Sequence, residues 1–417
     1  MGSSQSSQES ELSEEFNWNE SIETSDLNIL FDLNEPSNES SQQRDRFSDK
    51  LTSCVENCLK GKLKKLKTLN IMVVGITGCG KSTLINNLFR EQLADEGIGN
   101  AVTQHITKYC KPDLNLNIYD TPGFELGESR QKELLKGISK IHNPKDISQC
   151  IHCLLYCVKS EAQRFQNFEK DFIEKFSNHS DLKNIPIIIV ITQSFDTHVS
   201  NEMKRYIESI NLNVVGVIPV LAKERIINQN VYEAFGLEEL VGLIKDNLPC
   251  ILHETLNNAQ IASIKHKRDC SIGVISGAVA AAAAAGGSPI PFTDAALLIP
   301  VEIAMLAGIT AIYGINVSPE KILLILSCTL YNGAASFLVR TAVVNAIKCI
   351  PGIGTVIGGV ISGTSAAFIT GAIGATYTTF IDYVIKENID INSLKPDTLK
   401  GIVQPMFQNE IAKKRKR

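Results

Sequence analysis

The sequence shows no excess of basic charge. Its 41 lysines and arginines are slightly outnumbered by 45 aspartates and glutamates, which gives a formal net charge of −4. Because proteins that bind nucleic acid usually present a basic surface to the phosphates, this balance predicts no nucleic-acid partner. A secretory signal is not recognisable either. The 11 cysteines therefore predict free thiols in a reducing, cytoplasmic compartment, not a disulfide framework.

Three cysteines are closely spaced, at Cys150, Cys153 and Cys157. Such spacing can supply ligands to a zinc ion. The same residues lie in or beside the apolar run 151–158, which is typical of a buried strand, and free cysteine is a common small core residue. We favour a structural role for these cysteines, with a zinc site as the alternative.

Charged residues are scarce in the second half of the chain. From about Leu256 onward glycine, alanine and isoleucine dominate, and segments 271–293, 322–339 and 349–381 carry no charge. Roughly 20 apolar residues are enough for a helix that spans a bilayer. We therefore predict an all-α apolar domain over residues 253–390 that associates with a membrane lipid or a membrane protein at the cytoplasmic face of a membrane.

Glycine and proline shape these apolar segments. Glycines recur at four-residue spacing, for example at Gly273 and Gly277, which lets helices approach closely. Prolines such as Pro300 interrupt the apolar runs. The alternative is therefore a soluble helical domain whose helices are buried on all sides. Only Asp294 and Glu302 are acidic between positions 270 and 318, which is too little to define a channel pathway.

The two ends of the chain are polar. Residues 1–57 are rich in serine, asparagine and glutamate, so we predict a disordered segment there. Its first residues match the N-myristoylation pattern at Gly2, with a chance match in a serine-rich segment as the alternative. Lysines gather between positions 60 and 67 and again in a predicted basic tail over 391–417. A solvated linker and tail, an acidic membrane surface and, for the tail, a nuclear address all fit such basic runs.

Between the polar start and the apolar half, residues 58–252 alternate strand-like and helix-like patterns. Predicted strands cover residues 70–75, 114–120, 151–158, 185–191 and 214–220. Predicted helices follow Lys81 and cover residues 130–141, 165–176, 202–209 and 237–248. Continuous runs of Val, Ile and Leu are typical of a parallel sheet that is covered on both faces. The pattern predicts a doubly wound α/β domain whose ligand lies at the carboxyl ends of the strands.

The most specific motif is the segment 75–83, which spells GITGCGKST. It fits the P-loop pattern G-x-x-x-x-G-K-[ST] and lies between a predicted strand and a predicted helix. The backbone N–H groups of such a loop and the helix dipole bind phosphate, Lys81 is predicted to reach the β- and γ-phosphates, and Ser82 to ligate Mg²⁺. The predicted nucleotide-binding residues of this loop are Gly75, Thr77, Gly78, Cys79, Gly80, Lys81, Ser82 and Thr83.

A second motif, D-T-P-G over residues 120–123, ends the second predicted strand. Asp120 is predicted to hold Mg²⁺ through water, and the Gly123 amide to contact the γ-phosphate. With both motifs, the chain resembles the Era-type (TRAFAC-class) P-loop GTPases, which implies GTP and GDP as ligands. The resemblance also implies that Thr103 closes on Mg²⁺ and the γ-phosphate, and Thr107 is the fallback for this role.

The motif that recognises the base departs from the family pattern. In place of N-K-x-D the sequence has T-Q-S-F-D over residues 192–196. If Thr192 aligns with the asparagine, Asp196 comes one residue late; if Gln193 aligns with it, Asp196 is in register. A carboxylate here accepts from guanine N1–H and N2–H₂, so we predict that Asp196 recognises guanine. Thr192 and Gln193 are predicted to belong to the same binding site.

Two further positions bear on the nucleotide. The tripeptide Leu221-Ala222-Lys223 resembles the family's S-A-K motif, in which the alanine amide faces guanine O6, so Ala222 and Lys223 join the predicted site. Phe124 occupies the position where many relatives have a glutamine that orients the attacking water. The resemblance therefore implies slow hydrolysis of GTP to GDP, which a partner protein or a second G domain in a homodimer accelerates.

The apolar half carries a resemblance of its own. Residues 289–305, PIPFTDAALLIPVEIAM, are similar to the start of the DUF697 (YcjF-like) domain, which often follows an Era-like GTPase domain and is often membrane-associated. The sequence as a whole predicts a slow, Mg²⁺-dependent GTPase switch. In it Lys81 and Thr103 act on the γ-phosphate, and Ser82, Thr103 and Asp120 hold the metal. The alternative is a nucleotide-binding scaffold or membrane-remodelling protein with negligible hydrolysis.

Overall fold

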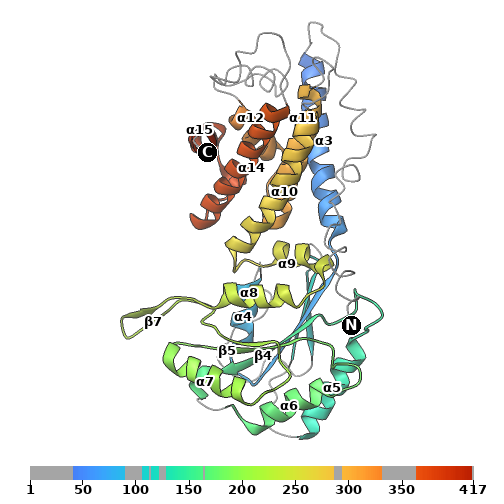
Figure 1. Ribbon diagram of the computed structural model, residues 1–417, viewed down its shortest axis with the longest axis vertical. Helices are drawn as coiled ribbons and strands as arrows, with labels where there is room; N and C mark the ends of the chain where they lie inside the picture. Colours follow the sequence, from blue (N-terminus) through green and yellow to red (C-terminus); the bar gives the residue numbers. More distant parts are fainter. Residues whose placement is uncertain are drawn as a thin grey trace, which may run out of the picture. The chain divides into compact units, whose positions relative to one another are not determined.

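The computed structural model divides the chain into two compact units (Figure 1). The structure describes residues 41–89, 106–111, 114–121, 128–162, 165–285, 294–330 and 363–415. Leu66–His266 form the first, which we call the sheet unit. The second, the helical unit, combines the described residues before Leu66 with those from Lys267 onward.

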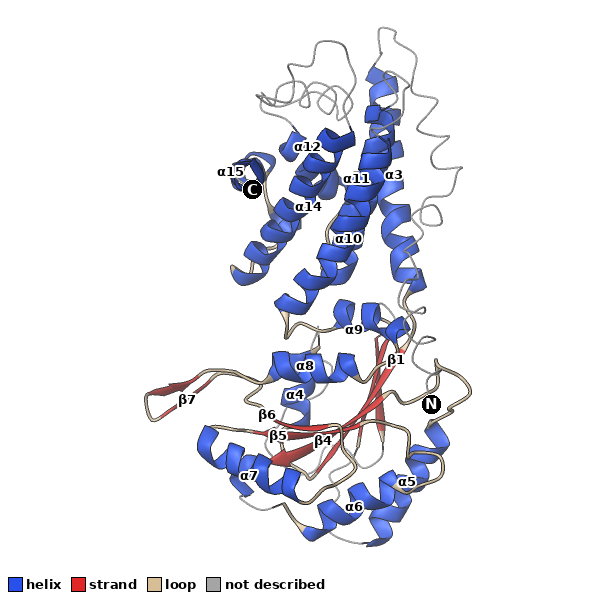
Figure 2. Ribbon diagram, viewed as in Figure 1, coloured by secondary structure: helices blue, strands red, loops and turns tan. Residues whose placement is uncertain are grey.

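A six-stranded sheet forms the centre of the sheet unit, in the order β2-β3-β1-β4-β5-β6. Four neighbouring pairs are parallel, and β2 pairs antiparallel with β3 at one edge. The strands are β1 (Leu69–Gly75), β2 (Thr107–Lys111), β3 (Leu116–Asp120), β4 (Cys153–Lys159), β5 (Ile187–Thr192) and β6 (Gly216–Pro219). Figure 2 shows this sheet with helices on both of its faces. The predicted doubly wound α/β fold is confirmed.

Alternate residues of each central strand face opposite sides of the sheet. On β1, Ile71 and Val73 belong to one apolar core, while Met72 and Val74 belong to the other. Since successive side chains of a strand point to opposite faces, a strand that is apolar throughout serves two cores. This arrangement explains why β1, β4 and β5 could be predicted from continuous apolar runs.

Two sets of helices cover the two faces (Figure 2). Helices α4 and α8 pack their apolar residues into one core, and α5, α6 and α7 pack theirs into the other. The helices are α4 (Lys81–Leu88), α5 (Glu128–Ile141), α6 (Asn167–Ser177), α7 (Thr197–Ser209), α8 (Leu237–Asp246) and α9 (His253–Ala259), with 3₁₀ turns at Ser160–Ala162 and Cys250–Leu252. All five predicted helices are therefore present.

The prediction missed three strands. Edge strand β2 has the sequence TKYCK and alternates partly buried with exposed residues, so it lacks a continuous apolar run. Strands β7 (Arg225–Ile227) and β8 (Asn230–Tyr232) form a separate antiparallel hairpin between β6 and α8. Their turn residues Asn228 and Gln229 have φ values of 49° and 68°. Asparagine tolerates this left-handed conformation, so the stretch I-I-N-Q-N-V carried a hairpin signal.

The helical unit is built from six described helices. They are α3 (Ser41–Lys65), α10 (Ile264–Ala285), α11 (Asp294–Tyr313), α12 (Pro319–Leu330), α14 (Gly363–Lys386) and α15 (Pro396–Arg415), with a 3₁₀ turn at Ile391–Ser393. Helix α11 packs against α3, α12 and α14, and α15 packs against α12 and α14. Helix α10 begins in the sheet unit and continues into the helical unit.

The boundaries of the helical unit differ from those predicted at both ends. Residues 41–57, expected to be disordered, belong to α3, where Leu51 and Val55 are fully buried. Residues 396–415, expected to be a basic tail, form α15, where Leu399 and Val403 are also buried. In each helix the apolar residues recur every four positions. They form a stripe that is buried, although the helix as a whole has a polar composition. The remaining residues of the predicted disordered segment lie outside the described residues.

Membrane association rests on one helix of the described residues. Ala366–Lys386 has the length and composition to cross a membrane, and 67% of its apolar window is buried inside the protein. Leu298–Tyr313 is apolar but shorter. A core helix of a soluble bundle has the same properties, so the predicted membrane association stays a prediction.

The clustered cysteines have mainly packing roles. Cys153 and Cys157 are fully buried on β4, and burial raises the pKa of the Cys153 thiol to about 12. Cys150 lies 3.8 Å from Nδ1 of His142, measured from its Sγ. Over the part of the chain that the structure describes, no three His, Cys, Asp or Glu side chains are grouped to hold a metal ion.

Candidate nucleotide-binding site

The P-loop connects the carboxyl end of β1 to the first turn of α4, as predicted. Gly78 and Gly80 have φ values of 75° and 91°, a left-handed conformation that favours glycine. Gly80 is the N-cap of α4 and leaves no side chain over the first turn. The amino end of a helix attracts anions, because its first N–H groups lack intrahelical partners and its dipole is positive there.

Lys81 lies over the loop that precedes it. Its Nζ donates to the carbonyl oxygens of Gly75 at 3.0 Å and Ile76 at 3.2 Å, and the residue is only 9% exposed. The ammonium group is therefore held inside the loop before any phosphate binds. Ser82, Thr83 and Thr77 are partly exposed around it, which leaves their hydroxyl groups within reach of a ligand.

The loop is fixed to the sheet by a close contact at its start. A Cβ placed on Gly75 would lie 2.4 Å from the carbonyl oxygen of Cys157 and 2.8 Å from Sγ of Cys79. Any larger residue at this position therefore forces β4 or the loop to move. A hydrogen bond with Cys157 also lowers the pKa of the Cys79 thiol, and Lys81 contributes in the same direction.

Asp120 ends β3 next to β1, where it pairs with Val73. The residue is buried, and burial raises the pKa of its carboxyl group to about 6, although Lys81 opposes this shift. Its Oδ1 has no hydrogen-bond partner among the described residues. Leaving a buried polar atom without a partner is costly, so this oxygen fits a carboxylate that binds a hydrated cation.

Two of the predicted γ-phosphate residues, Thr103 and Gly123, lie outside the described residues, and so does Phe124. The fallback residue Thr107 begins β2 and pairs across the sheet with Asp120. It is therefore part of an edge strand, where sequence analysis expected a loop.

Thr192, the last residue of β5, and Gln193, which follows it, are bonded to the P-loop. The Thr192 hydroxyl donates to the carbonyl oxygen of Cys79 and lies 3.0 Å from that of Val158. Nε2 of Gln193 donates to the carbonyl oxygen of Gly78 at 3.0 Å. These two side chains tie the carboxyl end of β5 to the P-loop.

Asp196 has a different role in the structure. It is the N-cap of α7, and its Oδ1 accepts from the backbone N–H groups of His198 at 2.8 Å and Val199 at 3.2 Å. The residue is exposed, and it does not line the pocket that lies beside the first turn of α4. Phe195 lines that pocket instead. Thr192 and Gln193 thus contact the P-loop, whereas the Asp196 carboxylate is directed at the start of α7.

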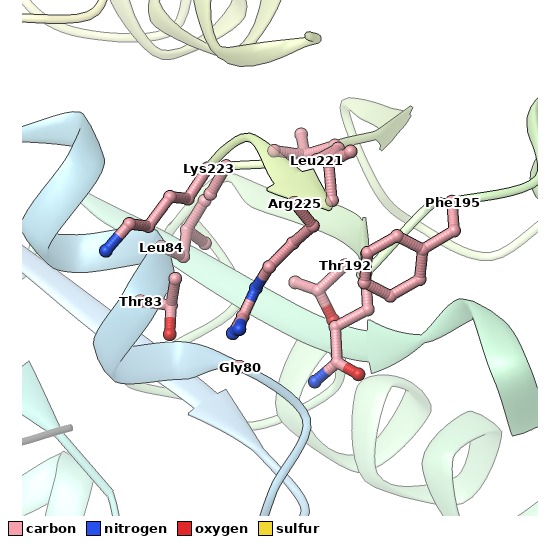
Figure 3. Close-up of a pocket in the computed structure, with 11 residues that line it drawn as sticks. Gly80, Thr83, Leu84, Thr192, Phe195, Leu221, Lys223 and Arg225 are labelled. Carbon is pink, nitrogen blue, oxygen red and sulfur yellow. The ribbon is translucent and has the colours of Figure 1, made fainter. Parts of the chain in front are cut away.

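A pocket of about 120 Å³ lies beside the first turn of α4 (Figure 3). It brings together six of the predicted residues from three separate stretches of the chain. These are Gly80, Thr83, Thr192, Gln193, Ala222 and Lys223. The lining residues that sequence analysis missed are Leu84, Phe195, Val220, Leu221 and Arg225.

Three of the missed residues, Val220, Leu221 and Arg225, lie at or just after the start of the segment that leads from β6 into the β7–β8 hairpin. Leu221 and Phe235 exchange two backbone hydrogen bonds, of 3.1 and 3.0 Å, which close the base of the segment that contains the β7–β8 hairpin. Gly236 follows with a φ of 82°, and a Cβ there would lie 2.2 Å from the carbonyl oxygen of Pro219. Both ends of the segment between Leu221 and Phe235 are therefore fixed on the sheet unit. This segment contains the hairpin and places Arg225 at the pocket.

Residues 70–193 match the family model described as the 50S ribosome-binding GTPase, MMR_HSR1. The match covers the P-loop, Asp120 and the Thr192–Gln193 pair. The sheet unit is a P-loop GTPase domain.

Curated proteins similar to this chain include septins. Cell division control protein 10 of Candida albicans is 27% identical over 206 residues, which is 42% of this chain and 56% of that protein. Neuronal-specific septin-3 of Danio rerio is 26% identical over 196 residues, with coverages of 40% and 53%. The chain spans about half the length of the curated relatives that it matches.

Solved structures give weaker likenesses. The septin GTPase domain of Chlamydomonas reinhardtii has a TM-score of 0.32 at 15% identity, over 49% of this chain and 93% of that one. Aquifex aeolicus Era bound to GDP and aluminium fluoride has the same TM-score of 0.32 at 16% identity, over 54% and 70% of the two chains. The Era-type assignment within the GTPases and the YcjF-like relation of the helical unit stay predictions.

Proposed function

We propose that this protein is a guanine-nucleotide switch whose GTPase domain hydrolyses GTP slowly and is coupled to the helical unit. The observation that carries the proposal is that the Lys81 ammonium group lies at the carboxyl end of β1, and Asp120 at the carboxyl end of the neighbouring strand β3. The ammonium group of Lys81 is held by loop carbonyls, and the buried Asp120 carboxylate has an oxygen without a partner in the described residues. A cation and a carboxylate so placed suit a metal-bound triphosphate.

The residues that would hold Mg²⁺ are Ser82 and Asp120, with Thr103 added by resemblance. When bound, the ion neutralises charge on the β- and γ-phosphates. The protein itself supplies the loop N–H groups, the Lys81 ammonium group and a rigid connection to β4. All of these position the phosphates without contributing a base.

Slow hydrolysis is proposed from the sequence alone, since Phe124 stands where relatives have a water-orienting glutamine. An apolar ring cannot orient water, so acceleration has to come from a partner or from a second GTPase domain of the same chain. The rival proposal is a scaffold that binds nucleotide without appreciable turnover.

A membrane partner for the helical unit is also a proposal. It is supported by the apolar composition of α11 and by α14, whose segment Ala366–Lys386 is long and apolar enough to cross a membrane. Flotation of the purified protein with anionic lipid vesicles tests it. Recovery of the protein with the vesicles supports the proposal, and protein that stays at the bottom of the gradient contradicts it.

The net charge of −4 gives no support to a nucleic-acid partner, although the description of the matching family names the ribosome.

The decisive experiment on the GTPase domain is nucleotide binding by the full chain in the presence of Mg²⁺. We expect GTP to bind and Lys81→Ala to abolish binding, whereas Lys183→Ala, an exposed lysine of the same domain, has no effect. Single-turnover hydrolysis at increasing protein concentration then separates the two proposals. A rate that rises with concentration supports a switch activated by self-association, and a flat rate near zero supports the scaffold.

A further inference from the structure

The contacts of Thr192 and Gln193 determine which residue after β5 reaches the pocket. Both side chains are engaged by carbonyl oxygens of the P-loop, Cys79 O and Gly78 O. The chain then continues through the buried Ser194, whose hydroxyl donates to the carbonyl oxygen of Ile191 at 2.9 Å. Phe195 is the next residue, and it lines the pocket.

The Asp196 carboxylate is directed elsewhere. Its Oδ1 accepts two backbone N–H groups at the start of α7, an arrangement that typically contributes about 1 kcal/mol to helix stability. A carboxylate that also recognised guanine would have to give up this cap or accept from both partners. The structure therefore offers an aromatic ring, not an acceptor, at the position where the family pattern has its aspartate.

The Phe195 ring is held in place by the hairpin. It meets the ring of Tyr232 edge to face, with centroids 5.9 Å apart and an interplanar angle of 83°. Tyr232 is the cross-strand partner of Arg225 in the β7–β8 pair. One short ribbon thus positions the aromatic ring of the pocket and the arginine that enters it.

Arg225 contributes hydrogen-bond donors to the pocket. Its side chain extends from the hairpin toward Gly80, and in Figure 3 the guanidinium group lies between Lys223 and Phe195. Within the described ranges this group has no hydrogen bond or ion pair with the protein. Guanidinium carries five N–H donors and no acceptor, so it pairs with acceptor atoms of a ligand.

The purines differ in the acceptors that they present to such a group. Guanine, hypoxanthine and xanthine all have an oxygen at C6 beside the acceptor N7, whereas adenine has an amino group that donates at C6. Guanine and xanthine differ at C2, where guanine has an amino group that an acceptor such as a carboxylate would bind and xanthine has an oxygen. Arg225 distinguishes 6-oxopurines from adenine but cannot distinguish among the 6-oxopurines.

We propose that Phe195 stacks on the base, that Arg225 recognises the 6-oxo group, and that Asp196 does not contact the base. The site then selects 6-oxopurine nucleotides over ATP and accepts GTP, ITP and XTP with similar affinity. This inference rests on the proposed function, since it assigns base recognition within the same nucleotide site.

The test compares equilibrium binding of GTP, ITP, XTP and ATP to the full chain with Mg²⁺. We expect the three 6-oxopurine nucleotides to bind within about threefold of one another and ATP at least tenfold more weakly, the factor of a good base contact. Arg225→Ala should remove most of the preference over ATP. Arg205→Ala, on the exposed side of α7, serves as the matched control and should leave it unchanged.

Asp196→Asn provides the opposing test. Asparagine is as good an N-cap as aspartate, so the fold is retained. If Asp196 recognised guanine, the amide would lose the contacts to N1–H and N2–H₂ and shift the preference toward XTP. We expect the ratio of GTP to XTP affinity to stay the same. Rejection of XTP by the unmodified protein, or a shift toward XTP in Asp196→Asn, overturns the inference.

Stacking of Phe195 on the base is tested by a separate substitution. Phe195→Ala should weaken all four nucleotides by about tenfold, because stacking on an aromatic ring tolerates every base. Equal binding of the four nucleotides by Phe195→Ala and the unmodified protein contradicts stacking. If no nucleotide binds the unmodified protein, the proposed function fails. If GTP binds and only the selectivity pattern differs, the function stands and the assignment of Arg225 fails.

Discussion

The rings of Phe195 and Tyr232 meet edge to face, with centroids 5.9 Å apart, and they join the loop after β5 to the β7–β8 hairpin. The two residues belong to different stretches of the chain, and Phe195 lines the pocket beside α4. Edge-to-face pairs contribute about 0.5–1.5 kcal/mol beyond the area that they bury. The hairpin is therefore held against this pocket by the contact between the two rings.

The first prediction concerns this aromatic pair. Tyr232→Ala should weaken GTP binding by about two- to tenfold, because Phe195 and Arg225 lose the contact that positions them. Tyr232→Phe keeps the ring and should bind GTP as the unmodified protein does. Tyr206→Ala, which removes a 55% exposed ring from α7, is the control. Isothermal titration with GTP measures all three variants, and equal affinities would show that the hairpin does not position the pocket.

Glu169 gives the GTPase domain a pH-dependent stability. The residue is buried in the first turn of α6, where Oε2 accepts from the N–H group of Gln166 at 2.8 Å. Burial raises the pKa of its carboxyl group to about 7 from the usual 4.5. The folded state thus binds the proton more tightly than the unfolded state, so stability decreases as the pH rises from about 4.5 to about 7.

Glu169→Gln should remove this dependence while the glutamine carbonyl keeps the bond to the Gln166 N–H group. At pH 8 the variant should be more stable than the unmodified protein by up to about 3 kcal/mol, and at pH 4 the two should be similar. Urea unfolding, followed by a probe in the GTPase domain, gives both values. A variant that is less stable at pH 8 would mean that the ionised carboxylate stabilises the α6 capping box.

The difference between the P-loop and Asp196 shows what sequence patterns can predict. The P-loop, strands β1, β4 and β5 and the five helices follow from local composition and spacing, since apolar runs and glycine positions determine them. The role of Asp196 depends on hydrogen bonds of Thr192 and Gln193 to a loop more than 100 residues earlier in the chain. These segments are far apart in the sequence, so local patterns could not show whether Thr192 or Gln193 aligns with the asparagine of N-K-x-D. Both alignments therefore stayed open.

Arg225 illustrates a second limit of prediction from the sequence, which concerns short or polar elements. Its hairpin carried a turn signal in Asn228 and Gln229, yet three-residue strands with exposed Ile226 and Val231 resemble a loop. The helical unit shows the same limit at a larger scale. Helices α3 and α15 have polar compositions, and only the four-residue spacing of buried Leu51, Val55, Leu399 and Val403 marks them as core helices.

The third prediction concerns Lys267 in the helical unit. This lysine is 2% exposed, and its Nζ donates to the carbonyl oxygens of Ile312 at 3.2 Å and Tyr313 at 2.9 Å. These carbonyls lie at the end of α11, where a cation also interacts favourably with the helix dipole. Lys267→Ala should destabilise the helical unit by about 1–3 kcal/mol, because it leaves buried acceptors unsatisfied. The exposed neighbour Lys265→Ala is the control, and thermal unfolding measures both.

Unchanged thermal stability of Lys267→Ala would contradict this prediction. If Lys267→Ala were as stable as the control, water or another donor would have to satisfy the two carbonyls. GTP binding is expected to remain unchanged in both variants, because the contacts of Lys267 lie within the helical unit. A loss of GTP binding would show that the proposed coupling of the two units runs through α10 and affects nucleotide affinity.

The last prediction tests whether α3 belongs to the helical unit, although it precedes the GTPase domain in the chain. Leu51 is fully buried on α3, and this helix packs against α11 and α12. Leu51→Ala should cost about 2–5 kcal/mol of unfolding free energy, the usual range for a buried leucine. The loss should appear as faster hydrogen exchange in α11 and α12, with GTP affinity unchanged. Lys64→Ala, an exposed position of the same helix, should leave exchange in α11 unaffected. Exchange that is accelerated in β1 but not in α11 would assign α3 to the GTPase domain, and the helical unit would then have to be stable without it.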